Sequence, residues 1–170
     1  MLRQRQPELF MHSYLVDSDT RKDSLTKEDL SWIRQHYEVF NRLAAESESF
    51  RLALGSAIDW RYTNDARAAI ARIWSGIESI FGITSELVFR ISLLSASLLE
   101  ERGEARKIRF EAVKKLYSLR SKAIHGESLP EEKILSAMND SFHILRELLL
   151  LTIEKGHVLT TKDFDNSVFE

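Results

Sequence analysis

The sequence has no cysteine, only two prolines and six glycines among its 170 residues, and no long apolar run. Without cysteine, the chain cannot form a disulfide, a thiolate nucleophile or a cysteine-ligated zinc site. The scarcity of proline and glycine permits long uninterrupted helices. The longest apolar run, Leu148 to Leu151, is far too short to span a membrane. No apolar stretch of signal-peptide length follows Arg3 and Arg5, so we expect a cytoplasmic protein with no membrane contact.

The chain also lacks a strong excess of either charge, since its formal net charge is −2. This balance argues against a generally basic nucleic-acid binder, so a site for a polyanion would have to be local. The length suits one domain that buries a sizeable core.

Apolar residues recur at steps of three and four through most of the chain, while no stretch alternates as a strand would. We therefore predict an all-α fold, a bundle of five or six helices spanning residues 26–156. Residues 1–25 are expected to be irregular, and residues 157–170 to form a tail. The expected helices run from Thr26 to about Ala45, from Ser47 or Ser49 to Tyr62, from Asn64 or Asp65 to Phe81, from Thr84 or Ser85 to Arg102, from Glu104 to Ile124, and from Ser128 to about Glu154.

Local signals refine these helices. The segment from Thr26 to Asp29 resembles a capping box and predicts the start of the first helix. Apolar residues on several sides of the fourth expected helix, including Val88 and Phe89, predict that it is buried on more than one side. In the N-terminal segment, residues 9–16 are expected either to form a short strand or to pack on the body.

The stretch from Tyr117 to Gly126 is the one place where residue types and spacing suggest chemistry. Arg120 and His125 lie five positions apart near the end of a basic helix, and a glycine follows at once. On a helix, five positions separate two side chains by about 140°. One copy of the motif is therefore an incomplete site, whereas two copies across a two-fold axis can bring two arginines and two histidines together.

Histidine and arginine suit the cleavage of RNA without a metal. Histidine moves protons near neutral pH, and the guanidinium fork of arginine binds phosphate and the charge that develops on it. RNA carries its own nucleophile, the 2′-hydroxyl, so we expect no cofactor. The other four histidines show no ligand spacing such as HExxH, so we expect no metal site either.

Basic residues are concentrated around this motif. Between positions 102 and 122 only Glu104 and Glu111 oppose them. This local surplus is suited to a phosphate backbone. The eight basic residues are Arg102, Arg106, Lys107, Arg109, Lys114, Lys115, Arg120 and Lys122.

The segment from Leu116 to Gly126 resembles the signature of the HEPN superfamily: an arginine, a polar residue, a short spacer and a histidine. It is most similar to the ApeA-like HEPN domains. The segment from Trp74 to Gly82 and the apolar helix from Glu86 to Leu99 resemble the same group. The resemblance covers roughly residues 65–150 and implies a helical bundle that dimerises, with metal-independent endoribonuclease activity at the dimer interface. Such domains serve in anti-phage defence or as toxins.

The resemblance implies roles for particular residues. Arg120 and His125 would be catalytic, and Ser121 takes the polar position where asparagine is common in the superfamily. Glu78 is expected to be either a solvated charge or a carboxylate that orients the motif. Tyr117 is expected to be either a core residue or a residue that supports the catalytic pair. The residues expected to contact RNA are Lys122, Lys115 and Lys114.

The sequence leaves two functions open for this domain. It is either a nuclease or a non-catalytic HEPN-like module for dimerisation or RNA binding. Its partners would be RNA, a second copy of the chain, and an antitoxin or an attached effector or sensor domain. ApeA-like proteins carry a larger region before this domain, so we expect either a stand-alone HEPN protein or a fragment.

Overall fold

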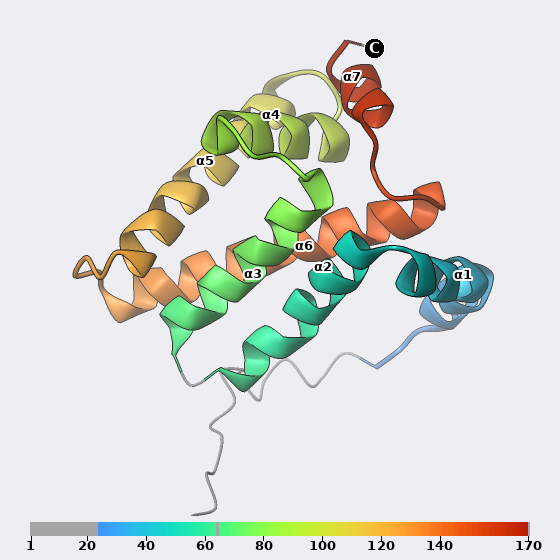
Figure 1. Cartoon of the computed structure of the whole chain (residues 1–170), viewed down its shortest axis with the longest axis horizontal. Coiled ribbons are helices and arrows are strands. Elements are labelled where there is room, and N and C mark those ends of the chain that lie inside the picture. The colour runs from blue at the N-terminus through green and yellow to red at the C-terminus, as the bar shows by residue number, and fades with distance from the viewer. Residues whose placement is uncertain (1–23, 64, 170) are drawn as a thin grey trace, which may run out of the picture.

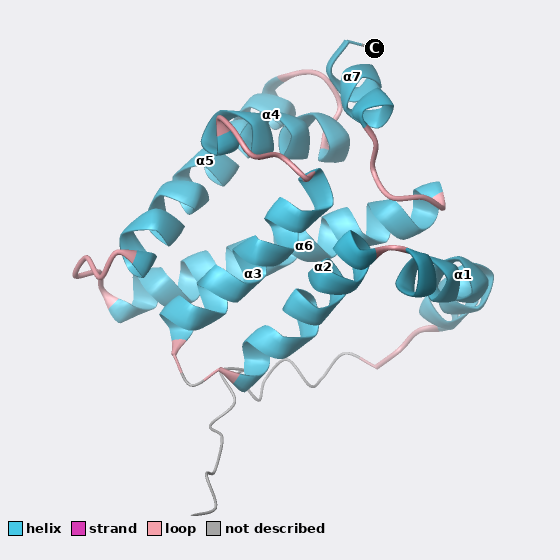
Figure 2. Ribbon diagram, in the orientation of Figure 1, coloured by secondary structure: helices cyan, strands magenta, loops and turns pink. Residues whose placement is uncertain are grey.

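Seven α-helices and one short 3-10 helix make up the part of the chain that the computed structural model describes, residues 24–63 and 65–169 (Figure 1). No strand occurs in these residues (Figure 2). The predicted all-α bundle is therefore confirmed, with seven α-helices in these residues where five or six were expected. The helices are α1 (Lys27–Glu46), α2 (Glu48–Asp59), α3 (Ala66–Phe81), α4 (Leu87–Leu99), α5 (Glu104–Ile124), α6 (Glu131–Lys155) and α7 (Thr161–Phe169), with the 3-10 helix η2 (Trp60–Tyr62) after α2.

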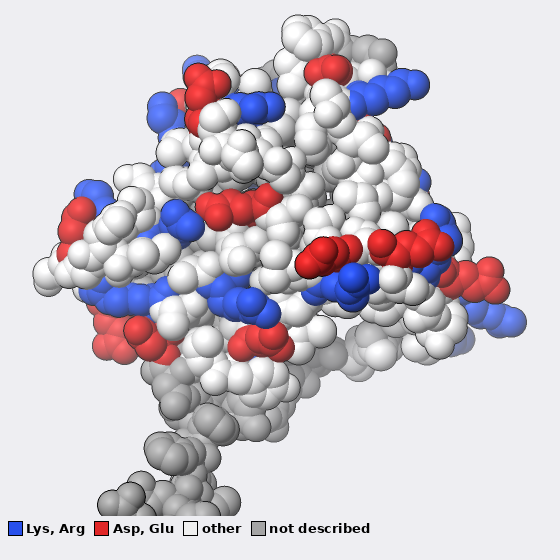
Figure 3. All heavy atoms as spheres, viewed as in Figure 1, with Lys and Arg blue, Asp and Glu red and all other residues white. Residues whose placement is uncertain are grey.

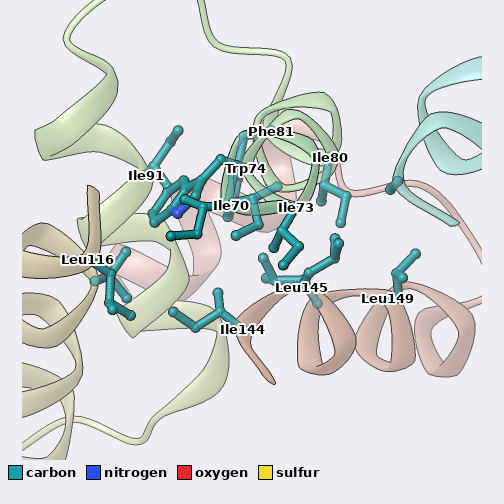
Figure 4. Close-up of a cluster of buried hydrophobic side chains, with 14 of the residues drawn as sticks. Ile70, Ile73, Trp74, Ile80, Phe81, Ile91, Leu116, Ile144, Leu145 and Leu149 are labelled. Atoms are coloured by element: carbon teal, nitrogen blue, oxygen red, sulfur yellow. The ribbon is translucent and has the colours of Figure 1, made fainter. Parts of the chain in front are cut away.

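Helix α3 is the centre of the bundle and packs against α2, α5 and α6 (Figure 1). Its predicted apolar face is buried throughout, from Ala69 to Phe81. Ile73 and Ile80 lie near Leu145 and Leu149 of α6, and Trp74 extends toward Leu116 of α5 (Figure 4). Burial of this face removes apolar area from water and supplies most of the drive for packing.

A glycine allows α3 to approach its neighbours closely. A Cβ atom at Gly76 would lie 2.7 Å from the Cβ of Ser56 on α2 and 3.0 Å from Leu145 on α6. The first distance is shorter than real Cβ atoms show and the second is unusually tight, so a larger residue here would require its neighbours to shift.

The helix boundaries follow the predicted capping signals at several positions. Thr26 and Asp29 form the expected capping box, with both reciprocal hydrogen bonds present. Ser47 and Asp65 cap α2 and α3, and Gly82 ends α3 in the left-handed conformation. Helix α5 has the predicted bounds. These contacts are local, which is why the sequence could predict them.

Other boundaries were predicted wrongly. Helix α4 has no side-chain cap from Thr84 or Ser85, because Glu86 precedes it in the left-handed conformation with φ of 52°. That helix ends at Leu99, and Gly103 begins the next one. Helix α6 starts after Pro130, not Ser128.

The expected C-terminal tail of residues 157–170 contains a helix, α7, which the sequence analysis did not predict. Thr160 and Asp163 form a second capping box, with the same Thr-x-x-Asp spacing as Thr26 and Asp29. Phe164 then packs against Phe81 of α3, with ring centroids 5.7 Å apart. The capping signal was present in the sequence, but the helix is only nine residues long and depends on this docking.

Two apolar faces are more exposed than predicted. Val88 and Phe89 of α4 are 38% and 57% exposed, so α4 is not buried on every side at its N-terminal end. Leu30, Ile33 and Tyr37, which we expected to form the buried face of α1, are each about half exposed or more. Residues 9–16, for which a strand or packing was expected, lie outside the described residues. In the described part of the chain, no helix combines the length and apolar character needed to cross a bilayer.

Candidate functional site

The motif occupies the C-terminal end of α5, where the helix closes on itself. The backbone N–H of His125 donates to the carbonyl of Ser121 at 3.0 Å, and that of Glu127 donates to Lys122 at 3.0 Å. Between them Gly126 has a φ of +77°, which glycine adopts without the penalty of a side chain. This closure satisfies carbonyls that the helix end would otherwise leave unpaired.

Arg67, in the first turn of α3, fastens this closure to the bundle. Its guanidinium donates to the carbonyl of Ala123 at 2.8 Å and to that of Glu127 at 2.9 Å. The two acceptors lie on either side of His125 and Gly126. Sequence reasoning missed Arg67, because neither carbonyl acceptor carries a signal in the side chains of the sequence.

Arg120 pairs with Glu78 of α3. The Nη2 atom of Arg120 lies 3.3 Å from the Oε1 atom of Glu78, and both side chains are about a quarter exposed. Within the described residues, the buried Nε atom of Arg120 has no hydrogen-bond partner. Of the two interpretations of Glu78, the contact with Arg120 agrees with the orienting carboxylate.

Tyr117 lies between this pair and the buried Trp74. Its ring meets the edge of Trp74 at a centroid distance of 5.1 Å, and the guanidinium of Arg120 lies 5.2 Å above it. Burial raises the pKa of the Tyr117 hydroxyl; the positive charge of Arg120 opposes this shift, and the negative charge of Glu78 adds to it. Trp74 is held in turn by a buried hydrogen bond to Ser141 of α6, 3.0 Å long.

His125 follows α5 directly, as its C-cap residue. Its side chain is exposed, and among the described residues its imidazole has no hydrogen-bond partner. The angle of about 140° between positions five apart directs it away from Arg120. Ser121 contributes its carbonyl to the helix end, and its side chain is half-buried. One protomer thus brings together Glu78, Tyr117 and Arg120, but not His125.

The three lysines expected at the RNA lie away from the Arg120 side. Lys122 is 3.9 Å from Glu127, and Lys114 is 3.9 Å from Glu111. Lys115 is exposed and lines a hollow between α5 and α6. The same hollow is lined by Lys133 of α6, which sequence reasoning also missed because only packing brings it to α5.

The charges on the face in Figure 3 are mixed. Acidic and basic side chains alternate there around a largely uncharged area, and no single sign dominates. In the described residues, no three histidine, aspartate or glutamate side chains gather closely enough to hold a metal ion.

Comparisons with protein-family models, with curated proteins and with solved structures give no match for this chain. The function proposed below rests on the geometry of the site.

Proposed function

We propose that this protein is a HEPN-type, metal-independent endoribonuclease whose active site forms where two copies of the chain meet. The observation that carries the proposal is the state of Arg120. Glu78 and Tyr117 hold its guanidinium at the surface, yet Nε is left without a hydrogen-bond partner among the described residues. The Nε atom itself is buried, but about a quarter of the Arg120 side chain is exposed, and a guanidinium fork suits a phosphate.

The reaction needs one base and one acid. One histidine removes the proton from the 2′-hydroxyl, and the resulting oxygen attacks the adjacent phosphorus. The bond to the 5′-oxygen breaks, a second histidine protonates that oxygen, and a 2′,3′-cyclic phosphate remains. Arg120 stabilises the negative charge on the phosphate during the transfer. A dimer supplies two copies of His125, which would serve as the base and the acid.

The rival is a non-catalytic module for dimerisation or RNA binding. The divergence of Arg120 and His125 around α5 favours it, because one copy alone does not assemble a site. Either version fits a role in anti-phage defence or as a toxin, with an antitoxin or an attached domain as partner.

The test is RNA cleavage by wild-type protein and by His125→Ala and Arg120→Ala variants, with the mass of the assembly measured in parallel. We expect a dimer that cleaves RNA in the presence of EDTA, and a loss of roughly 10²–10⁴-fold in rate for His125→Ala. Circular dichroism should show unchanged helical content. A monomeric wild type, or equal cleavage by all three proteins, would contradict the proposal.

A further inference from the structure

Two adjoining hollows lie between α5 and α6, with volumes of about 380 Å³ and 360 Å³. Lys115, Leu119 and Lys133 line both hollows. We refer to the two hollows together as the groove.

One half of the groove is strongly basic. Its lining includes Lys114, Lys115, Lys122 and Lys133, and Glu111 is the only acidic residue in that lining. Within the described part of the chain, no carboxylate forms an ion pair with Lys115 or Lys133. Their charges are therefore available to a ligand.

The other half is nearly neutral. Arg109 lies there, but it is held by Glu100 at 2.8 Å and by Glu147 at 3.1 Å. Asp140 offsets part of the remaining positive charge. An anion entering the groove is thus drawn toward the half near the C-terminal end of α5.

This basic half lies on the same side of α5 as His125. Ser118 lines the groove and precedes His125 by seven positions, which brings the two residues within about 20° of each other around the helix. Lys115 and Arg120, in contrast, are five positions apart and diverge by about 140°. His125 lines neither hollow, but helical spacing places the basic half on the side of α5 that is nearer to His125 than to the Arg120 of the same protomer.

We infer that this groove binds the phosphodiester backbone of single-stranded RNA, with Lys115 and Lys133 as phosphate contacts, and directs it to His125 of the same protomer. Two adjoining hollows lined by several lysines suit a chain of phosphates better than a single one. The inference deepens the proposed function by assigning the path of its substrate. Lys133 becomes a binding residue supplied by α6.

The experiment measures the binding of a fluorescein-labelled single-stranded RNA to His125→Ala protein, a background chosen to prevent cleavage during the measurement. Lys115→Gln with Lys133→Gln is compared with Lys27→Gln with Lys162→Gln, a control pair of exposed lysines on α1 and α7. Both pairs remove two positive charges, and circular dichroism checks that both fold.

We expect the groove pair to weaken binding at low salt by about tenfold or more, and the control pair to leave it within about twofold. The slope of log affinity against log salt should fall in magnitude by about 1.4 for the groove pair, since each phosphate contact on a single strand contributes about 0.7. Equal affinities and slopes for the two pairs would overturn the inference, as would an absence of RNA binding by the His125→Ala protein.

Cleavage by the same lysine variants with His125 intact separates this inference from the proposed function. If wild type and the groove pair cleave RNA at the same rate below saturation, the groove assignment fails and the nuclease stands. If RNA binds through the groove but wild-type protein never cleaves it, the groove assignment stands and the nuclease fails.

Discussion

Glu78 and Arg120 lie 42 positions apart in the chain, yet their side chains meet at 3.3 Å between α3 and α5. Both are about a quarter exposed, so solvent screens their attraction. The pair is better suited to directing the guanidinium than to holding the two helices together. Packing between the helices is supplied by Trp74 and Tyr117 beneath it.

Replacing Glu78 by glutamine should separate stability from activity. We expect the free energy of unfolding to change by less than about 1 kcal/mol, because the ion pair is partly exposed. RNA cleavage should fall by about 10²-fold, since Arg120 loses the group that orients it. Asp59→Asn is the control, as it removes the carboxylate of the Arg72 ion pair on α2 and α3 at 2.9 Å. Equal cleavage by Glu78→Gln and wild type would remove Glu78 from the site.

The pKa of the Tyr117 hydroxyl should report on the Glu78–Arg120 pair without any assay of activity. Because burial raises its pKa in the folded state, its contribution to stability is present below pH 10 and is lost as pH rises through the folded pKa. Chemical denaturation between pH 9 and 11 should show this loss in wild type and not in Tyr117→Phe. Tyr37→Phe, on the exposed side of α1, controls for the removal of a phenol.

Substitutions in the pair should move the Tyr117 transition in opposite directions. Arg120→Gln removes a positive charge and should raise the pKa of Tyr117, whereas Glu78→Gln removes a negative charge and should lower it. Absorbance of the phenolate, assigned by subtraction of the Tyr117→Phe titration, measures both. Shifts in the same direction would show that the two charges do not act on the ring as the geometry indicates.

Arg67→Ala should loosen the turn that carries His125. Two hydrogen bonds from a charged donor are lost, so we expect a decrease of about 1–3 kcal/mol in the free energy of unfolding. Amide exchange should accelerate at residues 124–127, and RNA cleavage should fall with it.

Arg51→Ala is the matched control for Arg67, because Arg51 also donates to two carbonyls at a helix end, those of Ala44 and Ala45. It should cost similar stability but accelerate exchange only near the end of α1. Unchanged amide exchange at residues 124–127 in Arg67→Ala would mean that the backbone hydrogen bonds of the turn stabilise it without Arg67.

Asp163→Asn should destabilise α7 in a pH-dependent manner. Burial works to raise the pKa of Asp163, but hydrogen bonds from Thr160 and His157 outweigh it and hold the pKa well below the usual value of 3.8. The charged form therefore stabilises the fold above pH 4, and this contribution is lost as pH falls through the folded pKa. At pH 7 we expect a loss of about 1 kcal/mol, typical of a helix cap.

Denaturation curves of wild type and Asp163→Asn should converge as the pH is lowered from 5 to 2. Asp29→Asn serves as the comparison, because it makes the same change in the capping box of α1, where the carboxylate is exposed. If the difference in the free energy of unfolding between wild type and Asp163→Asn stays constant with pH, the effect comes from altered packing or hydrogen bonding at this position and not from the carboxylate charge.

The bounds of α5, the cap Thr26 and the stop Gly82 could be predicted from sequence, because each depends on residues within one or two turns. The caps of α2 and α3 could be narrowed to two neighbouring candidates each, of which the structure uses Ser47 and Asp65. The buried face of α3 could be predicted for the same reason, as its period of three to four residues is written along one segment. Helix α7 could not be predicted in this way. Its capping box alone does not stabilise so short a helix, which also needs the contact of Phe164 with Phe81, more than 80 positions away in the chain.

The sequence by itself determined an all-helical chain with Arg120 and His125 at the end of a basic helix, about 140° apart. Only the tertiary structure decided their surroundings. Packing of α3 on α5 gave Arg120 its partner Glu78, and packing of α6 on α5 added Lys133 to the lysines of the groove. The physical reason is that helical period and capping are local, whereas the partner of a side chain depends on which helices meet and at what angle.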